Sequence, residues 1–324
     1  MNSDNCILTI IVPVYNHENY IEQTLMSIYN QKTDYKYQVY IGEDKSTDNT
    51  RSVLMELQKK LPDNFVFLYR EKNLGSGNFY DLCNYINTKY YAVLEGDDYW
   101  CDDNKIQTQI DFLEKHDEYM GVSHWVNVVD KNSNPSSVIV THIEGEYTYR
   151  DYKNSKRPGH TSSKVVRSGF INYKRMYAEE FPDLKYPGDQ IEAFLFACFF
   201  RVYCIPKKMS CYRFVRDSGT SYSATHKFDN KAKINKIKYF YSNYVFAKEK
   251  NGNKKIIKLS HKQYIFYMYR FRKDLNIPKE MIKREIKDSK MPLGIYMFII
   301  SRAVKAAVRK IDDKLHKDRF IIRP

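Results

Sequence analysis

The chain has 324 residues with 53 basic and 39 acidic side chains, a formal net charge of +14. This length is sufficient for one large domain or two ordinary domains with a buried core. No window reaches the roughly 18 uninterrupted apolar residues of a membrane-spanning helix. The six cysteines form no CxxC pair and no secretory signal precedes the first predicted strand, so we expect a cytoplasmic protein with reduced thiols.

The first hundred residues alternate short β-branched apolar runs, which predict buried strands, with segments of helical apolar spacing. Ser46 or Thr47 is a candidate N-cap for the second helix. The alternation predicts a mostly parallel α/β sheet wound with right-handed crossovers. The predicted strands cover residues 7–14, 37–42, 65–69 and 90–94, and the predicted helices cover residues 18–30, 46–61 and 79–87.

The rhythm changes in the rest of the chain. Helical spacing at 105–115 and an apolar run at 121–129 predict one more helix and strand, followed by turns and short strands to residue 149. Residues 150–225 predict a mixture of helix, including 190–200, and irregular segments. From residue 230 the pattern is helical and basic: residues 226–324 hold 27 basic against 9 acidic side chains, a net of +18, whereas residues 1–225 have a net of −4.

Three acidic residues, Glu95, Asp97 and Asp98, follow the fourth predicted strand within four positions. Such a concentration of negative charge is unfavourable unless a cation neutralises it. Carboxylate oxygens are the ligands that Mg²⁺ and Mn²⁺ prefer, and these ions are commonly shared with a phosphorylated substrate. Because open α/β sheets bind ligands at the carboxyl ends of their strands, this pattern predicts a metal–diphosphate site there.

The other three strands of this half also end in polar or small residues. Pro13, Val14, Tyr15 and Asn16 follow the first strand, Asp44 follows the second, and the turn at 73–77 follows the third. Parallel strands would bring these ends to one edge of the sheet. Together they offer a ring to stack on, a carboxylate for an imide N–H, and a turn that permits close backbone approach. We therefore predict a pocket for a uracil nucleotide diphosphate.

The order of these segments resembles the inverting glycosyltransferases of family 2, which have the GT-A fold. Residues 11–16 (IVPVYN) look like the opening strand and nucleotide loop of that family, and residues 41–48 (IGEDKSTD) are similar to its DDGSTD segment. Residues 73–75 (NLG) are similar to its NxG turn, and residues 94–98 (LEGDD) look like its DxD motif. The resemblance is dense over 7–105, thin over 106–225 and absent beyond.

The resemblance implies a Rossmann-like, mostly parallel GT-A sheet flanked by helices, with a basic helical C-terminal region. We expect a nucleotide-sugar-binding half at 1–105, an acceptor-binding half at 106–225 and the basic region at 226–324. It implies transfer of a hexose or N-acetylhexosamine from a UDP-sugar to a lipid-linked or polymeric surface glycan, assisted by Mn²⁺ or Mg²⁺.

Site roles follow from the matching positions. In the nucleotide loop, Pro13, Val14 and Tyr15 would line the base and ribose beside Asn16, and Glu18 would close the donor loop or begin the first helix. Asp44 would accept a hydrogen bond from uracil N3–H, and Gly75 would permit close approach of the backbone. In the acidic segment, Asp97 would approach the ribose or the metal, and Asp98 would ligate the metal. Glu43 and Glu95 replace the commoner Asp. The basic residue usual after the NxG turn is missing, so neutralising the diphosphate would fall more heavily on the metal or on a basic group from elsewhere, such as Arg70, Lys72 or Arg213.

Inversion requires a base on the acceptor side. Asp189, in residues 186–192 (YPGDQIE), looks like the family's GED segment at the head of a helix, where the helix dipole favours an ionised carboxylate. Its alternative role is the N-cap of helix 190–200, and Glu192 is the reserve base.

Several further residues are candidates for contacts around the acceptor and the diphosphate. His160 and the pair His124–Trp125 would line the acceptor pocket or belong to the core. Arg213, followed by residues 219–221, resembles a late segment that closes over the diphosphate, with Val215 in place of its usual His.

Residues 295–311 predict a helix with Lys305, Arg309 and Lys310 near one polar face. Residues 291–324 would then contact an anionic membrane and hold the protein peripherally on the inner face of the cell membrane. The alternatives are a helix packed on the catalytic domain or on a second subunit of a homo-oligomer. No nucleic-acid motif accompanies the basic region, so we expect no nucleic-acid partner.

Two other functions compete with the transferase. A sugar-phosphate nucleotidyltransferase would need a glycine- and basic-rich loop directly after the first strand, where this chain has residues 13–18 (PVYNHE). A non-catalytic nucleotide-binding protein of the membrane surface would keep the pocket without the base.

Overall fold

The structure is a computed structural model that describes residues 6–215, 229–315 and 321–322, with side chains up to residue 304. The strands are β1 (Leu8–Val14), β2 (Tyr37–Glu43), β3 (Phe65–Tyr69), β4 (Tyr90–Val93), β5 (Tyr99–Trp100), β6 (Gly121–Val129), β7 (Ile139–Val140), β8 (Gly145–Glu146), β9 (Val165–Arg167), β10 (Val202–Arg213) and β11 (Ile321–Ile322). The helices are α1 (Ile21–Tyr29), α2 (Thr50–Gln58), α3 (Ser76–Leu82), α4 (Lys105–Lys115), α5 (Tyr149–Lys153), α6 (Phe170–Glu180), α7 (Gly188–Phe199), α9 (Asn230–Glu249), α10 (Lys254–Phe271), α11 (Lys279–Asp288) and α12 (Pro292–Leu315), with short 3₁₀ turns at Cys83–Tyr85 and Thr161–Ser163.

The described residues form one nine-stranded sheet in the order β3-β2-β1-β4-β9-β6-β10-β5, with β8 beside β10. Strands β3, β2, β1 and β4 are parallel neighbours, and β6 and β10 are also parallel. Strand β9 runs antiparallel between β4 and β6. The predicted mostly parallel sheet is therefore confirmed, and the antiparallel β9 joins its two parallel parts.

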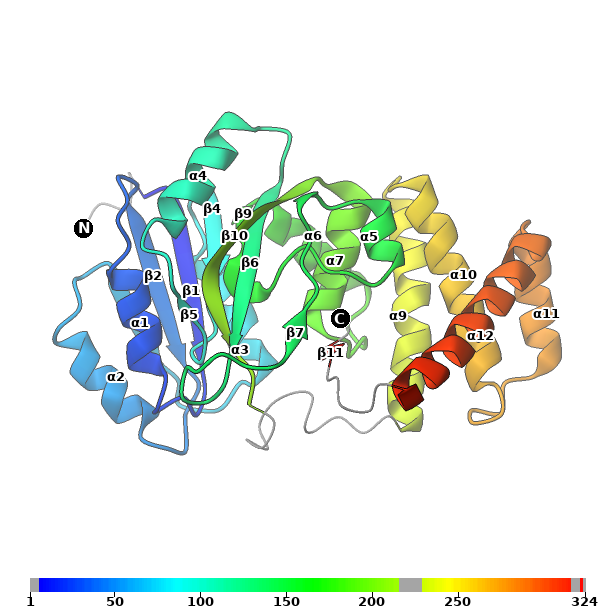
Figure 1. The fold of residues 1–324 in the computed structure, drawn as a ribbon, viewed down its shortest axis with the longest axis horizontal. Helices are drawn as coiled ribbons and strands as arrows, with labels where there is room; N and C mark the ends of the chain where they lie inside the picture. The colour runs from blue at the N-terminus through cyan, green and yellow to red at the C-terminus, as the bar shows by residue number, and fades with distance from the viewer. Residues whose placement is uncertain (1–5, 216–228, 316–320, 323–324) are drawn as a thin grey trace.

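Strand β1 is buried on both faces, as its continuous apolar run predicts. Ile10 and Val12 belong to one core cluster, which α1, α2 and α4 complete, while Ile11 points to the other, which α3, α6 and α7 complete. Figure 1 shows these helices packed around the sheet. This two-sided burial fixes the strands, so their carboxyl ends are held at defined positions on one edge.

Helices α9–α12 pack beside one another at the opposite end of the molecule from β3 (Figure 1). They share a core cluster that includes Tyr239, Ile265 and Ile295. The Tyr239 hydroxyl donates to the carbonyl of Gln190 at 2.8 Å, so α9 also supports the first turn of α7. Among the described helices, none has the combination of length and apolar composition needed to cross a bilayer.

Several expected helix starts are wrong. Helix α1 begins at Ile21, three residues after the expected start, and α12 begins at Pro292, three residues before its expected start. Helix α2 begins at Thr50, not at Ser46, because the Ser46 hydroxyl instead accepts from the backbone N–H of Asn16. Helix α3 begins at Ser76, three residues before the expected start. Strand β10 was also missed, since the region 150–225 was expected to hold helix and irregular segments. Helix α4 and strand β6 have the predicted bounds.

Candidate functional site

The loops after β1 and β2 are tied to each other by side chains. The Asn16 backbone, with φ of 57°, donates to Ser46 Oγ at 3.0 Å, and Asn16 Oδ1 accepts from the Thr47 backbone N–H at 2.8 Å. Glu18 Oε2 accepts from the Asn49 backbone N–H at 2.8 Å. Asn16 and Glu18 therefore fix the shape of the expected nucleotide loop. Their contacts with a nucleotide stay a prediction.

Asp44 connects β2 to the turn after β3. Its two carboxylate oxygens accept from the backbone N–H groups of Leu74 and Gly75 at 2.7 and 2.9 Å, and the Asn73 amide donates to the Asp44 carbonyl. Gly75 has φ of 55°, a conformation that favours glycine. Asp44 is nearly fully buried. Sequence reasoning missed its role in positioning the 73–75 turn, because the backbone groups that it binds lie about 30 residues further along the chain. Its bond to uracil stays a prediction.

The acidic segment after β4 lies against the end of β1. The Gly96 N–H donates to the Pro13 carbonyl at 3.2 Å. A Cβ at Gly96 would lie 2.6 Å from His17 Nδ1, so this position has no space for a side chain. Of the expected base-lining residues, Tyr15 exposes its ring, whereas the Val14 side chain is buried in the core. All four strand ends thus meet at one edge of the sheet.

Glu95, Asp98 and His160 bring ligand atoms within 4.8 Å of one another. Asp98 is buried; its Oδ1 accepts from the Arg213 backbone N–H at 2.9 Å, and its Oδ2 has no hydrogen-bond partner. A buried carboxylate oxygen without a partner is costly unless a cation accompanies it. Asp97 does not belong to this group in the part of the chain that the structure describes.

The charge states within this group suit a cation. Burial, with the charges of Asp97 and Glu95, raises the pKa of Asp98 well above its usual range. Glu95 is solvent-accessible at one side, yet desolvation by the surrounding protein, with the charges of Asp97 and Asp189, raises its pKa from 4.5 to about 7. These carboxylates repel each other's negative charge, which a divalent ion would relieve.

His160 is neutral, because burial and the positive charges of Lys164 and Arg157 lower its pKa to about 3. The 3.5 Å contact between His160 Nδ1 and Asp98 Oδ2 is therefore not an ion pair but the approach of a neutral imidazole to a carboxylate. Neutral imidazole is the form that binds metals. Two carboxylates and one imidazole fit Mn²⁺, since carboxylates suit Mg²⁺ and Mn²⁺ while imidazole suits the transition metals. Sequence reasoning placed His160 with the acceptor and missed this position.

The raised pKa of Glu95 predicts a pH-dependent stability. Because the folded-state pKa lies above the unfolded value, the metal-free protein should lose stability as pH rises from about 4.5 to about 7. Glu95→Gln removes the titrating group and with it this loss of stability. In EDTA, the urea midpoint of the variant should therefore exceed that of wild type by more at pH 8 than at pH 5. Mn²⁺ should raise the wild-type midpoint more at pH 8 than at pH 5, since binding requires the ionised ligand.

The exposed Glu71→Gln is the matched control for this measurement and should show no such change with pH. If the urea midpoints of Glu95→Gln and wild type differed by the same amount at every pH in this range, the raised pKa of Glu95 would be contradicted.

Asp189 lies in the first turn of α7, whose N-cap is Pro187, so Asp189 is not the cap of this helix. Its carboxylate pairs with Arg157 at 2.7 Å, and both side chains are about one-third exposed. The charge of Asp189 contributes to the raised pKa of Glu95, so the two carboxylates lie within electrostatic range of each other. Asp189 is therefore a partly accessible carboxylate that interacts electrostatically with one of the candidate metal ligands.

Glu192, one turn further along α7, is a poor base. Burial would raise its pKa, but ion pairs with Lys164 and Lys174 outweigh burial and hold the pKa below its usual value. The His124 side chain is not accessible to an acceptor, because its ring is buried in the core. This burial also lowers the pKa of His124 well below its usual range. Trp125 donates to the Ile143 carbonyl at 2.8 Å and is half-buried.

The expected diphosphate ligand Arg213 has a buried guanidinium. It donates to the carbonyls of Asp97 and Asp130 at 2.9 and 3.0 Å and to Gln23 Oε1 at 2.7 Å. This geometry makes Arg213 a residue that positions the acidic segment, and a direct contact with diphosphate stays a prediction. Of the alternatives, Arg70 pairs with Asp81. Residues 219–221, expected to close over the donor, lie outside the described residues.

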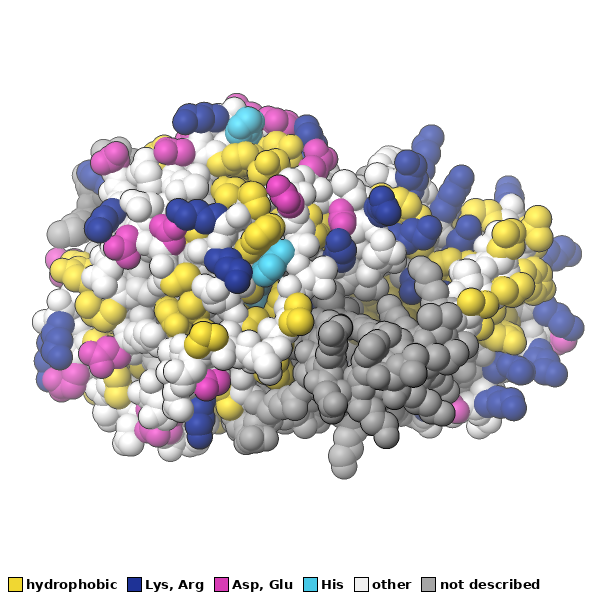
Figure 2. Space-filling model, in the orientation of Figure 1, with side chains coloured by type: hydrophobic (Ala, Val, Ile, Leu, Met, Phe, Trp, Pro, Cys, Tyr) yellow, Lys and Arg dark blue, Asp and Glu magenta, His cyan; other side chains and the backbone are white. Residues whose placement is uncertain are grey.

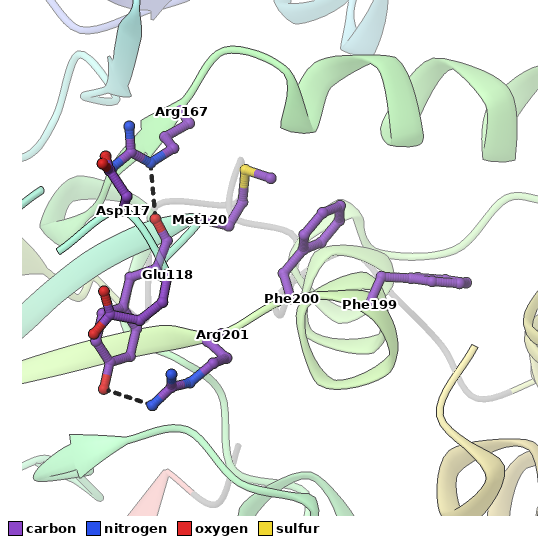
Figure 3. Close-up of a pocket in the computed structure, with 8 residues that line it drawn as sticks. Asp117, Glu118, Met120, Arg167, Phe199, Phe200 and Arg201 are labelled. Carbon is purple, nitrogen blue, oxygen red and sulfur yellow. Dashed lines mark hydrogen bonds and ion pairs between the residues drawn. The ribbon is translucent and has the colours of Figure 1, made fainter. Parts of the chain in front are cut away.

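A cavity of about 280 Å³ lies elsewhere, at the amino-terminal ends of β6 and β10 (Figure 3). Its two arginines are engaged: Arg167 donates to the Tyr119 carbonyl at 2.9 Å and pairs with Asp117, and Arg201 pairs with Glu146. It opens at the sheet edge opposite to the acidic cluster and contains none of the predicted site residues. We therefore place the candidate site at the carboxyl edge.

The clustered strand ends define an open α/β sheet, an architecture that binds ligands at the carboxyl edge of its strands. The family model Glycosyl transferase family 2 matches residues 9–180, more than half of the chain. The chain therefore belongs to glycosyl transferase family 2.

Solved structures and curated proteins agree with this family. The TarS fragment of S. aureus in complex with UDP-GlcNAc is similar with a TM-score of 0.56 and 17% identity, over 87% of this chain and 79% of that one, which shows the GT-A fold. An uncharacterized protein of Mycobacterium tuberculosis is 34% identical over 123 residues, which are 38% of this chain and 36% of that protein. Chondroitin synthase of Escherichia coli is 32% identical over 97 residues, which are 28% of this chain and 13% of the synthase. The chain thus matches well under two thirds of the length of these two curated proteins.

Proposed function

We propose that this protein is an inverting glycosyltransferase that moves a hexose or N-acetylhexosamine from a UDP-sugar to a lipid-linked or polymeric surface glycan, at the inner face of the cell membrane. The observation that carries the proposal is the cluster of Glu95, Asp98 and His160 at the edge where four strand ends meet, with the Asp189 carboxylate in electrostatic range of Glu95. The UDP-GlcNAc complex of TarS and the polysaccharide-making relative support the donor and acceptor classes.

In the proposed reaction, Asp189 removes the proton of an acceptor hydroxyl while that oxygen bonds to the anomeric carbon of the donor. The bond between the anomeric carbon and the diphosphate oxygen breaks in the same step. Arg157 orients the Asp189 carboxylate through its ion pair. A divalent ion held by Glu95, Asp98 and His160 would stabilise the charge of the departing diphosphate. Asp44 and the 73–75 turn form one wall of the nucleotide site.

The division into parts at residues 105 and 225 stays part of this proposal. Strands from both sides of residue 105 share one sheet, which agrees with two halves of a single domain. Helix α9 would then support the base, since its Tyr239 hydroxyl bonds the carbonyl next to Asp189.

The proposal is tested by UDP release from a panel of UDP-sugars, with and without Mn²⁺ and with saccharide acceptors. We expect one UDP-sugar to support release that depends on Mn²⁺ and increases with acceptor. A nucleotidyltransferase would instead release pyrophosphate from UTP and a sugar phosphate. Absence of UDP-sugar binding at about millimolar concentration, which corresponds to about −4 kcal/mol, would overturn the proposal.

A further inference from the structure

Helix α12 is apolar on two opposite sides, and the rest of the protein covers only one of them. Ile295 is fully buried, Ile299 packs against the core of the C-terminal helices, and Phe298 contacts Phe266 edge-on with ring centroids 6.0 Å apart. These positions attach α12 to α10 and α11. The other apolar side of the helix faces away from this contact.

The outward side is a continuous stripe. It consists of exposed residues spaced i, i+3, i+4, i+7, i+10 and i+11, which is one helix face: Leu293, Tyr296, Met297, Ile300, Ala303 and Val304. Leu293, Met297 and Ile300 expose 72%, 63% and 62% of their surfaces, and these are the largest values among the exposed large apolar residues that the structure describes. A stripe of this kind is energetically unfavourable in water.

Basic side chains surround this end of the protein. Figure 2 shows dark blue Lys and Arg around the yellow surface of α11 and α12. A cavity of about 320 Å³ adjoins the start of α12 and is lined by three lysines, Lys248, Lys258 and Lys290. The ion pairs that the described residues of this region form involve other lysines, Lys233, Lys250 and Lys283, so no salt bridge compensates the three cavity lysines.

We propose that the outward face of α12 (the α12 stripe) lies on an anionic lipid surface, with the stripe in the acyl boundary and the cavity lysines at the phosphate headgroups. Apolar residues flanked by Lys and Arg are typical of interfacial helices, and phosphate headgroups complement the net charge of +18 in residues 226–324. A second copy of this chain would bring the same positive charge to the face and be repelled. Lys305, Arg309 and Lys310 enter this argument only through that net charge, because their side chains lie outside the described part of the structure.

This surface goes beyond the proposed reaction and does not depend on it, because α12 lies at the opposite end of the molecule from α1 and α2, the helices that follow β1 and β2 (Figure 1). The two proposals can therefore fail separately. If the surface binds lipid but no UDP-sugar is turned over, only the function is lost.

The test is co-sedimentation of the full chain with vesicles of phosphatidylcholine alone or with roughly one third phosphatidylglycerol, since anionic lipid supplies the surface potential. Wild type should bind the anionic vesicles and release in about 1 M salt, where the Debye length is about 3 Å. Met297→Gln with Ile300→Gln should weaken binding about tenfold or more, because it removes apolar area that would enter the membrane. Lys258→Gln with Lys290→Gln should weaken binding to anionic vesicles selectively.

Met55→Gln with Ile139→Gln is the matched control, since it makes the same two exchanges at exposed positions of the other half of the chain. It should bind like wild type, and all variants should unfold at the wild-type temperature. UDP binding in the absence of vesicles should be unchanged in the stripe variant.

Three results would overturn the proposal: no binding by wild type, equal binding to both kinds of vesicle, or equal loss in the stripe and control variants. A wild-type dimer that the stripe variant dissociates, measured by sedimentation equilibrium, would also overturn it and make the stripe a subunit interface.

Discussion

Asp189→Asn should lower turnover by about 10² to 10⁴-fold, the range that a positioned general base contributes. The amide oxygen can still accept from Arg157, whose guanidinium lies 2.7 Å from the carboxylate in the folded protein. The side chain at position 189, in the first turn of α7, therefore keeps its contact with Arg157, while the carboxylate that would take the hydroxyl proton is lost. Steady-state kinetics with the UDP-sugar identified in the panel, and calorimetric titration with UDP, should show a fall in kcat with UDP affinity within a few-fold of wild type.

Asp183→Asn is the control for this prediction, because it makes the same exchange at an exposed position shortly before α7. It should leave kcat unchanged. Arg157→Gln should reduce kcat less than Asp189→Asn does, since Arg157 orients the base without taking the proton. Wild-type turnover by Asp189→Asn would move the base elsewhere, and a parallel loss of UDP affinity would give Asp189 a binding role instead.

The first half of the fold follows from local patterns. Strands β1 to β4 have short apolar runs, and burial on both faces requires such runs, so their positions were predictable to within one residue at each end. Strand β10 was not, because Pro206, Lys207 and Lys208 interrupt its apolar pattern. The ladder with β6 shifts register between Ile205 and Ser210, so the strand accommodates these residues by an irregularity. Because this irregularity depends on the pairing of β10 with β6, the sequence of β10 alone does not show the apolar pattern of a strand.

The site shows the same division between local and tertiary information. The meeting of the four strand ends was predictable, because parallel strands place their carboxyl ends on one edge. His160 was not assigned to the acidic cluster, since it is 62 residues from Asp98. Tertiary contacts bring it there, namely the pairing of β9 with β4 and the packing of the His160 ring on Tyr212 of β10. A strand signal at residues 165–167 would have placed His160 near β4. Arg157 meets Asp189 only through the packing of two distant segments.

A comparison of Asp98→Asn with Asp97→Asn should separate the two sets of metal ligands. One set is the pair Asp97 and Asp98 predicted from sequence, and the other is Asp98 with Glu95 and His160, which the structure brings together. The exchange keeps the oxygen that accepts from the Arg213 backbone and removes the negative charge from the oxygen without a partner. Burial raises the pKa of Asp98 well above its usual range, so the metal-free fold loses stability as pH rises above the ordinary pKa of an aspartate. In EDTA, the variant should therefore unfold at the wild-type temperature or higher.

With Mn²⁺ the order should reverse. An ion present at 100 times its Kd stabilises the folded state by about 2.7 kcal/mol, and this increment should appear in wild type and vanish in Asp98→Asn. Activity should fall at least about a hundredfold, because the charge of the departing diphosphate loses its cation. Asp97→Asn changes the same charge one residue away and should keep most of the Mn²⁺ increment in thermal unfolding. Equal loss of the Mn²⁺ increment in both variants would support the ligand pair Asp97 and Asp98 predicted from sequence. A Mn²⁺ increment that survives in Asp98→Asn would mean that other groups hold the cation.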